Sequence, residues 1–172
     1  LSNATGDTIT ADVSGYADVD TLTVTNAGTD ITGVTVTTKA NVTSLTVDGG
    51  AGADIDDLQH DETTTTATAS VANTDALTTV SLIGFADATA ASAIASDSLT
   101  SITLKDVLGL VTNTDDYIAT TDTRTLTVAY NGGTNTGFTD AGATTVNVNI
   151  DAATANAGTN TFDAATTLNV EV

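Results

Sequence analysis

The segment Leu99-Thr-Ser-Ile-Thr-Leu104 indicates the fold, because its pattern recurs along the chain. A small or aliphatic residue comes first, threonine and a small polar residue follow, and an aliphatic–polar–aliphatic alternation ends the pattern. The final aliphatic residues of successive copies lie 20 to 24 residues apart. The copies occupy residues 77–82, 99–104, 143–148 and 165–170, and a shorter form occupies 125–128.

Each copy alternates with the period of two that is typical of a β-strand with one buried face. One short strand cannot bury that face alone, and a step of about 22 residues suits one coil of a parallel β-solenoid. Nearer the N-terminus the pattern ends at Val24, Val36 and Val47, at half that step, as expected of successive strands of one coil. The sequence therefore predicts one all-β solenoid domain over residues 1–172, with about eight coils of two or three strands each.

The aliphatic residues of the pattern are expected to point inward and to supply most of the stability. A fully buried side chain of this kind contributes about 1.5–3 kcal/mol. The predicted inward positions are Val80, Leu82, Ile102, Leu104, Val128, Val146, Val148, Leu168 and Val170.

An antiparallel immunoglobulin-like β-sandwich is the alternative fold. Its strands recur every 8 to 12 residues, which fits the N-terminal spacing. The near-identical sequences of the later repeats and the lack of tryptophan favour the solenoid. Residues 86–98 are rich enough in alanine to predict one short helix.

Composition excludes several classes of partner. The chain of 172 residues carries 22 acidic residues against 3 basic ones, a net charge of −19. Binding of nucleic acid or anionic lipid requires clustered lysine and arginine, so neither partner is expected. No apolar run approaches the about 20 residues of a membrane-spanning helix, so no membrane insertion is expected. Cysteine is absent, which excludes disulfides and thiolate metal sites.

The acidic residues are almost all aspartate, because glutamate occurs only at positions 62 and 171. Aspartate suits turns, where its short side chain binds nearby backbone, and calcium sites built from oxygen ligands. Residues 49–54, Gly-Gly-Ala-Gly-Ala-Asp, match the start of the nonapeptide that binds Ca²⁺ in RTX-type β-rolls. The predicted calcium ligands are Asp48, Gly49, Ala51, Asp54, Asp56, Asp57, Asp61 and Glu62.

This calcium motif departs from the RTX pattern in two respects. Asp56 stands where an apolar residue should fill the core, and the motif occurs only once. A glycine-rich turn followed by a solvated acidic stretch is therefore the alternative. The pair Asp115-Asp116, with Asp106 and Asp122 nearby, is a second acidic segment, for which a simple turn is favoured.

The sequence predicts that the chain is not an enzyme. His60 is the single histidine, and its acidic neighbours indicate a solvated side chain with a modestly raised pKa. Arg124 is the one basic residue that resembles a lyase base, and no aromatic groove accompanies it. The Thr-x-Thr pairs could form a flat ice-binding ladder, but threonine is more simply the outward residue of the strands.

Taken together, the cysteine-free, acidic, Thr/Ala/Asp/Gly-rich chain resembles the surface-layer (S-layer) proteins that Gram-negative bacteria export by type I secretion. The residues that carry the likeness are the repeated strands 99–104 and 165–170 and the motif 49–54. The resemblance implies a calcium-dependent solenoid on the bacterial cell surface, outside the cell. It also implies self-assembly into a two-dimensional lattice on lipopolysaccharide without catalysis, and a chain that is a fragment of a longer protein. A repeat domain of a large secreted RTX-type adhesin, a binding module, is the competing class.

Overall fold

The computed structural model describes residues 8–25, 31–39, 41–50, 55–63, 75–114, 123–151 and 155–172. These residues form sixteen strands. They include no helix that is long and apolar enough to cross a membrane.

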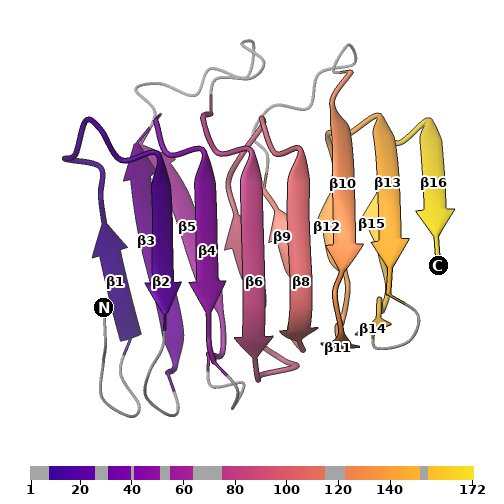
Figure 1. Cartoon of the computed structure of the whole chain (residues 1–172), viewed down its shortest axis with the longest axis horizontal. Coiled ribbons are helices and arrows are strands. Elements are labelled where there is room, and N and C mark those ends of the chain that lie inside the picture. Colours follow the sequence, from indigo (N-terminus) through magenta and orange to yellow (C-terminus); the bar gives the residue numbers. More distant parts are fainter. Residues whose placement is uncertain are drawn as a thin grey trace.

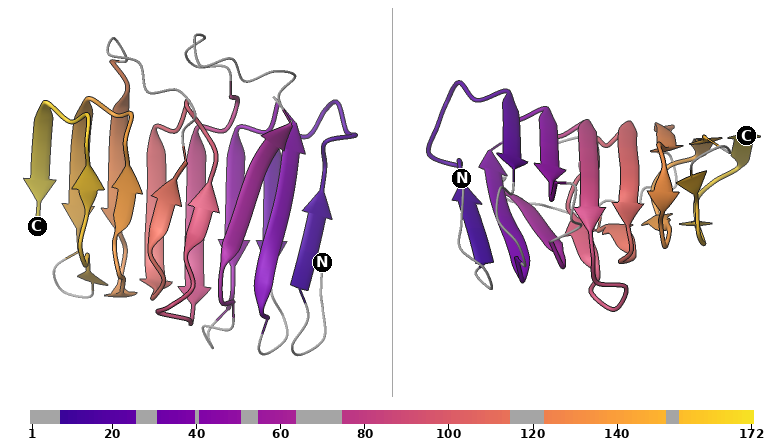
Figure 2. Two further views of the ribbon diagram at one scale, coloured as in Figure 1. Left: turned by 180° about the vertical axis from the view of Figure 1, so that it is seen from behind. Right: turned by 60° about the horizontal axis from the view of Figure 1, so that its bottom comes forward.

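Fourteen of the strands build two facing parallel sheets of seven strands each, here named sheet A and sheet B (Figures 1 and 2). Sheet A contains, in spatial order, β1 (Thr8–Asp12), β3 (Gly33–Lys39), β5 (Leu58–Thr63), β7 (Ser92–Ile94), β9 (Val111–Asn113), β12 (Phe138–Asp140) and β15 (Thr161–Phe162). Sheet B contains β2 (Thr21–Thr25), β4 (Ser44–Asp48), β6 (Thr79–Phe85), β8 (Ser101–Val107), β10 (Thr125–Tyr130), β13 (Thr145–Ile150) and β16 (Thr167–Glu171). A small third sheet pairs β11 (Gly133–Thr134) with β14 (Ala155–Asn156).

The chain alternates between sheets A and B and advances by one strand position in each turn, which makes a β-solenoid (Figure 1). The solenoid has about 6 turns with a spacing of about 23 residues. The predicted solenoid is confirmed, and the antiparallel sandwich is wrong. The N-terminal half-step is also explained, because β2, β3 and β4 lie in sheets B, A and B. The expected eight coils are too many, because intervals such as that between β4 and β6 exceed 22 residues.

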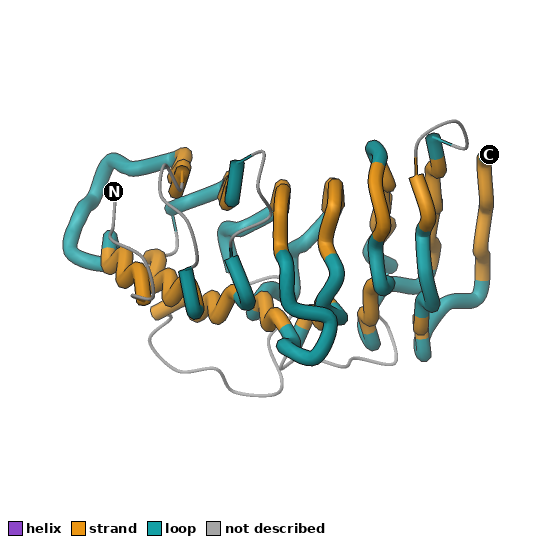
Figure 3. Tube along the Cα trace, turned by 90° about the horizontal axis from the view of Figure 1, so that it is seen from below, coloured by secondary structure: helices purple, strands orange, loops and turns teal. Residues whose placement is uncertain are grey.

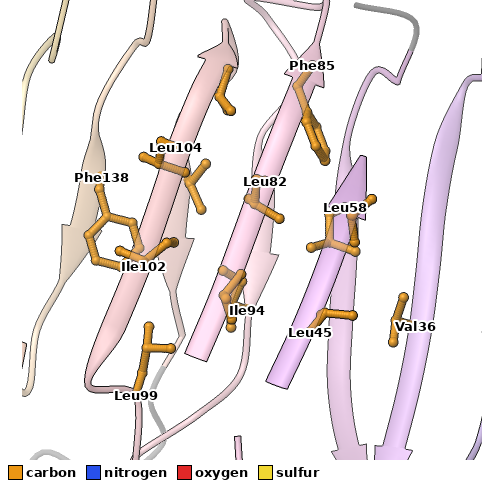
Figure 4. Packing of buried hydrophobic residues seen from close by; sticks show 14 of the residues in the cluster. Val36, Leu45, Leu58, Leu82, Phe85, Ile94, Leu99, Ile102, Leu104 and Phe138 are labelled. Carbon is orange, nitrogen blue, oxygen red and sulfur yellow. The ribbon is translucent and has the colours of Figure 1, made fainter. Parts of the chain in front are cut away.

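The aliphatic residues of the repeat stack on one another inside the solenoid (Figure 4). Val80 lies beside Ile102, and Leu82 lies beside Leu104, in the register that joins β6 to β8. These four side chains are fully buried, as are most of the other predicted inward positions. Leu168 and Val170 pair with Val146 and Val148 and share their inward side, but they are not buried, being 56% and 57% exposed. Both belong to β16, which has a neighbouring strand only on its β13 side among the described residues.

The threonine of the repeat joins one coil to the next at the entrance to sheet B. The hydroxyl of Thr78 donates to the carbonyl of Thr43 at 3.1 Å, and that of Thr100 donates to Thr78 at 3.2 Å. Thr166 repeats the bond to Thr144 at 3.2 Å. The hydroxyl and the backbone N–H of the same threonine reach one carbonyl of the preceding coil. Each of these threonines thus makes two hydrogen bonds to the preceding coil, which explains why the repeat contains threonine at this position.

At the C-terminal ends of the strands of sheet B, the chain turns through residues with left-handed backbone conformation. Gly84, Asp106 and Gly132 have φ angles of 71°, 55° and 116°. Gly84 and Asp106 are the last residues but one of β6 and β8, and Gly132 comes two residues after β10. Asp106 follows Lys105, the register partner of Ile83, so Asp106 lies beside Gly84 in the next coil. Aspartate is one of the few residues with a side chain that tolerate this conformation. The corner therefore selects glycine or a short polar residue.

Residues 86–98 contain no helix, so that prediction is wrong. The segment contains β7, and Ala93 pairs with Gln59 in sheet A. The hydroxyl of Ser92 accepts a hydrogen bond from the N–H of Leu58 at 3.0 Å. The helix propensity of alanine is a weak preference, and the requirement for a strand in this coil overrides it.

We expect Leu82→Ala to lower the free energy of unfolding by about 2–5 kcal/mol, because the substitution opens a cavity in a closed core. Leu168→Ala is the matched control on an exposed position of the same repeat and should cost far less. Urea denaturation of both variants measures the difference, and similar losses would contradict the inward assignment.

Candidate functional site

The predicted calcium loop begins with Asp48, the last residue of β4. Its Oδ1 accepts a hydrogen bond from the N–H of Gly50 at 2.8 Å, and Gly50 has a φ of 79°. The N–H of Gly49 donates to the carbonyl of Ile83 in the next coil at 2.7 Å. This start of the loop is therefore a tight turn in which aspartate binds the backbone two residues later.

The same turn recurs at other aspartates. The Oδ1 atoms of Asp12, Asp87 and Asp140 accept from the N–H two residues later at 3.0, 2.7 and 3.0 Å. Hydrogen bonds from Ser14 and Thr89 hold the pKa values of the exposed Asp12 and Asp87 carboxyls below the usual range. The hydrogen bond from the N–H to Oδ1 closes a short ring of atoms, and the glutamate side chain is one methylene too long for it. The preference for aspartate is thus explained by turn geometry at these positions.

The other predicted ligands lie on sheet A or outside the described residues. Asp56 and Asp57 precede β5, and the N–H of Asp56 donates to the carbonyl of Ile31 at 3.0 Å. Asp61 lies on the outer, exposed side of β5. Glu62 follows it in the strand. Ala51 and Asp54 lie outside the described residues, as do Asp115, Asp116 and Asp122 of the second acidic segment.

The described part of the predicted ligand set does not converge on one point. Asp48 ends a strand of sheet B, whereas Asp61 belongs to sheet A and faces away from the core. Within the described residues, no group of three or more acidic or histidine side chains could hold a metal ion. Calcium binding here depends on residues 51–54 and stays a prediction.

His60 is buried, so the prediction of a solvated histidine is wrong. The side chain is 4% exposed and lies on the inner face of β5, where the strand alternation places it. Its Nε2 atom is 3.0 Å from Oγ1 of Thr38 in the neighbouring β3. Nδ1 has no hydrogen-bond partner among the described residues. Burial lowers the pKa of His60 to about 4, although the charge of Asp61 opposes the shift.

We expect this histidine to make stability fall in mild acid. The unfolded chain gains a proton near pH 6.5, whereas the folded chain gains it only near pH 4. The free energy of unfolding should therefore drop by up to about 3 kcal/mol as the pH falls between these values. His60→Gln keeps a hydrogen-bonding group beside Thr38 and removes the titration. Denaturation at a series of pH values checks this, and parallel curves for both proteins would contradict it.

A buried ion pair between Arg124 and Asp140 is the main polar feature of the interior. The guanidinium Nη2 donates to Oδ1 of Asp140 at 3.0 Å, and Nη1 donates to Oδ2 at 3.1 Å. Nη1 also donates to the carbonyl of Leu99 at 2.7 Å. The side chains of Arg124 and Asp140 are 2% and 0% exposed. Arg124 is therefore a structural residue, enclosed and bound on several sides.

Neighbouring polar groups complete what we name the inner polar network, formed by Ser96, Asn113, Arg124 and Asp140. Asn113 donates through Nδ2 to Asp140 Oδ2 at 2.9 Å and to the carbonyl of Ser96 at 2.8 Å. Its Oδ1 accepts from the N–H of Ser96 at 3.1 Å. The carboxylate of Asp140 also accepts from the N–H of Ala143 at 2.8 Å. The network connects consecutive coils through charged and amide groups.

Sequence reasoning missed this network, because its residues share no motif. The one available signal was the position of Arg124 immediately before the repeat strand 125–128, in a chain with only 3 basic residues. Its partners could not be chosen among 22 acidic residues without the register of the coils.

We expect Arg124→Met to lower the free energy of unfolding by about 3–5 kcal/mol, because it leaves the Asp140 carboxylate charged and buried. Adding Asp140→Asn removes that charge and keeps an oxygen acceptor for the turn. The double variant should therefore recover part of the loss. A double-mutant cycle by chemical denaturation measures the coupling, and strictly additive losses would contradict it.

Threonine faces outward on both sheets, as on Thr10 and Thr35 of sheet A and Thr23 and Thr46 of sheet B. Thr38 of β3 is an exception, because it is fully buried beside His60.

In comparisons with known proteins, no family model matches the chain, and no curated protein or solved structure matches it significantly.

Proposed function

We propose that the chain is a structural component of a bacterial surface layer, which assembles with other copies outside the cell in the presence of calcium. The observation that supports the proposal is the continuous solenoid core, in which the strands of each coil bond to those of the next. Such a rod is stabilised along its whole length by contacts between neighbouring coils. That is the mechanical property that a load-bearing lattice requires.

The environments of His60 and Arg124 support a structural role over a catalytic one. Both side chains are almost fully enclosed, and both bind groups of the protein itself. A general base or a substrate-binding cation must reach the substrate. His60 and Arg124, the two residues considered for catalysis from the sequence, thus bind neighbouring coils of the protein itself.

The surface charge also favours an extracellular assembly. A net charge of −19 keeps separate chains apart by repulsion. Divalent cations can join such chains to one another, or to the phosphate groups of lipopolysaccharide, by neutralising both partners. Calcium would then act as the trigger for assembly.

A repeat domain of a secreted adhesin is the second candidate. A stiff spacer that holds a binding module away from the cell needs the same continuous core. Assembly separates the two functions: at high protein concentration with millimolar calcium, electron microscopy should show ordered sheets for the surface-layer protein. A soluble monomer under those conditions favours the adhesin domain.

Calcium should raise the melting temperature of the chain if residues 48–62 bind it. A ligand that binds only the folded state adds about 2.7 kcal/mol at a hundredfold excess over its dissociation constant. Extracellular calcium modules bind at roughly 10⁻⁴–10⁻³ M, so millimolar ion should be effective. Melting is followed by circular dichroism in calcium and in chelator.

Asp54→Ala should lower the melting temperature in calcium and leave it unchanged in chelator. Asp18→Ala, which removes an exposed aspartate of the loop between β1 and β2, is the control and should behave as the wild type. Equal melting of the wild type with and without calcium would leave the glycine-rich turn as the explanation of this segment.

A further inference from the structure

We propose that Asn131 is a modification site, at which the folded chain converts its own asparagine to aspartate or isoaspartate with loss of ammonia. Asn131 and Gly132 directly follow β10, at the lower edge of the molecule in Figure 1, and Figure 3 shows this edge from below. The reaction uses only water and groups of the chain, so it does not depend on the surface-layer proposal.

The reaction begins when the backbone nitrogen of Gly132 attacks the side-chain carbonyl carbon Cγ of Asn131. The new bond from nitrogen to Cγ closes a succinimide ring, the bond from Cγ to the side-chain nitrogen breaks, and ammonia leaves with the proton of the Gly132 N–H. Water then opens the ring at one of its two carbonyl carbons. One opening gives aspartate, and the other gives isoaspartate, in which the main chain runs through the former side chain. Glycine at the second position favours ring closure, because it has no Cβ to hinder the attack.

The two reacting groups of Asn131 and Gly132 make no competing hydrogen bonds in the fold. The side chain of Asn131 is exposed, and neither this side chain nor the N–H of Gly132 bonds to any described residue. The main-chain N–H of Asn131 donates to the carbonyl of Leu104 at 3.0 Å, which fixes the residue at the end of β10. The fold thus holds the backbone at this corner and leaves the amide carbon and the attacking nitrogen unengaged.

The Asp48-Gly49 pair can form the same ring, with loss of water in place of ammonia, but the fold engages both of its reacting groups. The N–H of Gly49 donates to the carbonyl of Ile83 at 2.7 Å, and Oδ1 of Asp48 accepts from the N–H of Gly50 at 2.8 Å. Gly49 is also closely enclosed, because a Cβ there would lie 2.2 Å from the carbonyl oxygen of Gly84. The structure therefore separates two sites that look alike in sequence: Asp48 is held, and Asn131 is open to reaction.

The charged neighbours of Asn131 can accommodate the carboxylate that the reaction forms. Tyr130 pairs with Leu104 in β8 and with Ile150 in β13. The residues one step further along these strands, Lys105 and Asp151, therefore flank Asn131, and both are exposed. A new carboxylate between a cation and an anion is attracted by one and repelled by the other, and solvent screens both effects. The added charge alone should therefore change stability little.

Isoaspartate has a larger effect, because it adds a methylene to the main chain between residues 131 and 132. The carbonyl of Gly132 accepts from the N–H of Asp106 at 3.4 Å and from Nδ2 of Asn135 at 3.2 Å. Gly133 packs against the carboxylate of Asp106 so closely that a Cβ there would lie 1.6 Å from Oδ1. A longer main chain must displace these contacts. Isoaspartate at position 131 should therefore loosen the corner that joins two coils, whereas aspartate should not.

Incubation of the full chain at neutral pH, folded and in urea, tests the site by peptide mapping with mass spectrometry. Folding should slow the reaction of Asn131 by less than about tenfold and that of Asp48 by more, because Asp48 must first break two hydrogen bonds through local opening. Asn131→Gln keeps the amide on a side chain one methylene longer, which closes a ring far less readily, and should stay unmodified. Slowing of Asn131 by more than about tenfold overturns the proposal, as does equal slowing of the two residues.

Melting of the modified chain tests the structural consequence. The isoaspartate form, separated by reversed-phase chromatography and refolded, should melt at a lower temperature than the unmodified chain by circular dichroism. Asn131→Asp is the matched control, because it has the same charge and an ordinary main chain, and it should melt close to the wild type. Equal losses in the isoaspartate form and in Asn131→Asp would assign the effect to charge and overturn the role of the main chain at this corner.

Discussion

The structure depends on one constraint: each coil must place its backbone groups in register with those of the coil before it. The strands are parallel, so a ladder of hydrogen bonds runs along each sheet and like residues lie beside like. Threonine at one corner adds a second bond to the same carbonyl, as between Thr78 and Thr43. Left-handed residues such as Gly84 and Asp106 form the other corner. The sequence repeats because every coil must meet these same requirements.

The repeat could be predicted because it is a local pattern. Alternation of Val80, Ser81 and Leu82 is visible in sequence, and its step gives the length of a coil. The environment of His60 could not be predicted in this way, because it depends on which face of β5 turns inward and on Thr38 in another coil. The pairing of Arg124 with Asp140 likewise follows from stacking across coils. For the calcium loop, the motif 49–54 defines a hypothesis whose central residues lie outside the described part of the chain.

The distribution of charge follows from the same architecture. A thin core of two sheets has little room for ionised groups, and several of the described aspartates lie at turns, where they accept backbone hydrogen bonds, as Asp48 and Asp87 do. Asp140 makes the same turn, and its carboxylate also accepts two hydrogen bonds from the buried guanidinium of Arg124. The inner polar network is therefore an elaboration of the turn that aspartate makes elsewhere in the chain.

The position of that network has a physical reason in the length of the strands. Strands β3 and β5 of sheet A contain 7 and 6 residues, whereas β7, β9 and β12 contain only 3 each. Shorter strands make fewer ladder bonds between coils, and side-chain amides add further bonds there. Asn113 of β9 donates to Asp140 of β12 at 2.9 Å, and Asn160 accepts from the N–H of Phe138 in β12 at 3.2 Å. The N-terminal half of sheet A thus relies more on its backbone ladder, and the C-terminal half on particular side chains that another residue type would not replace.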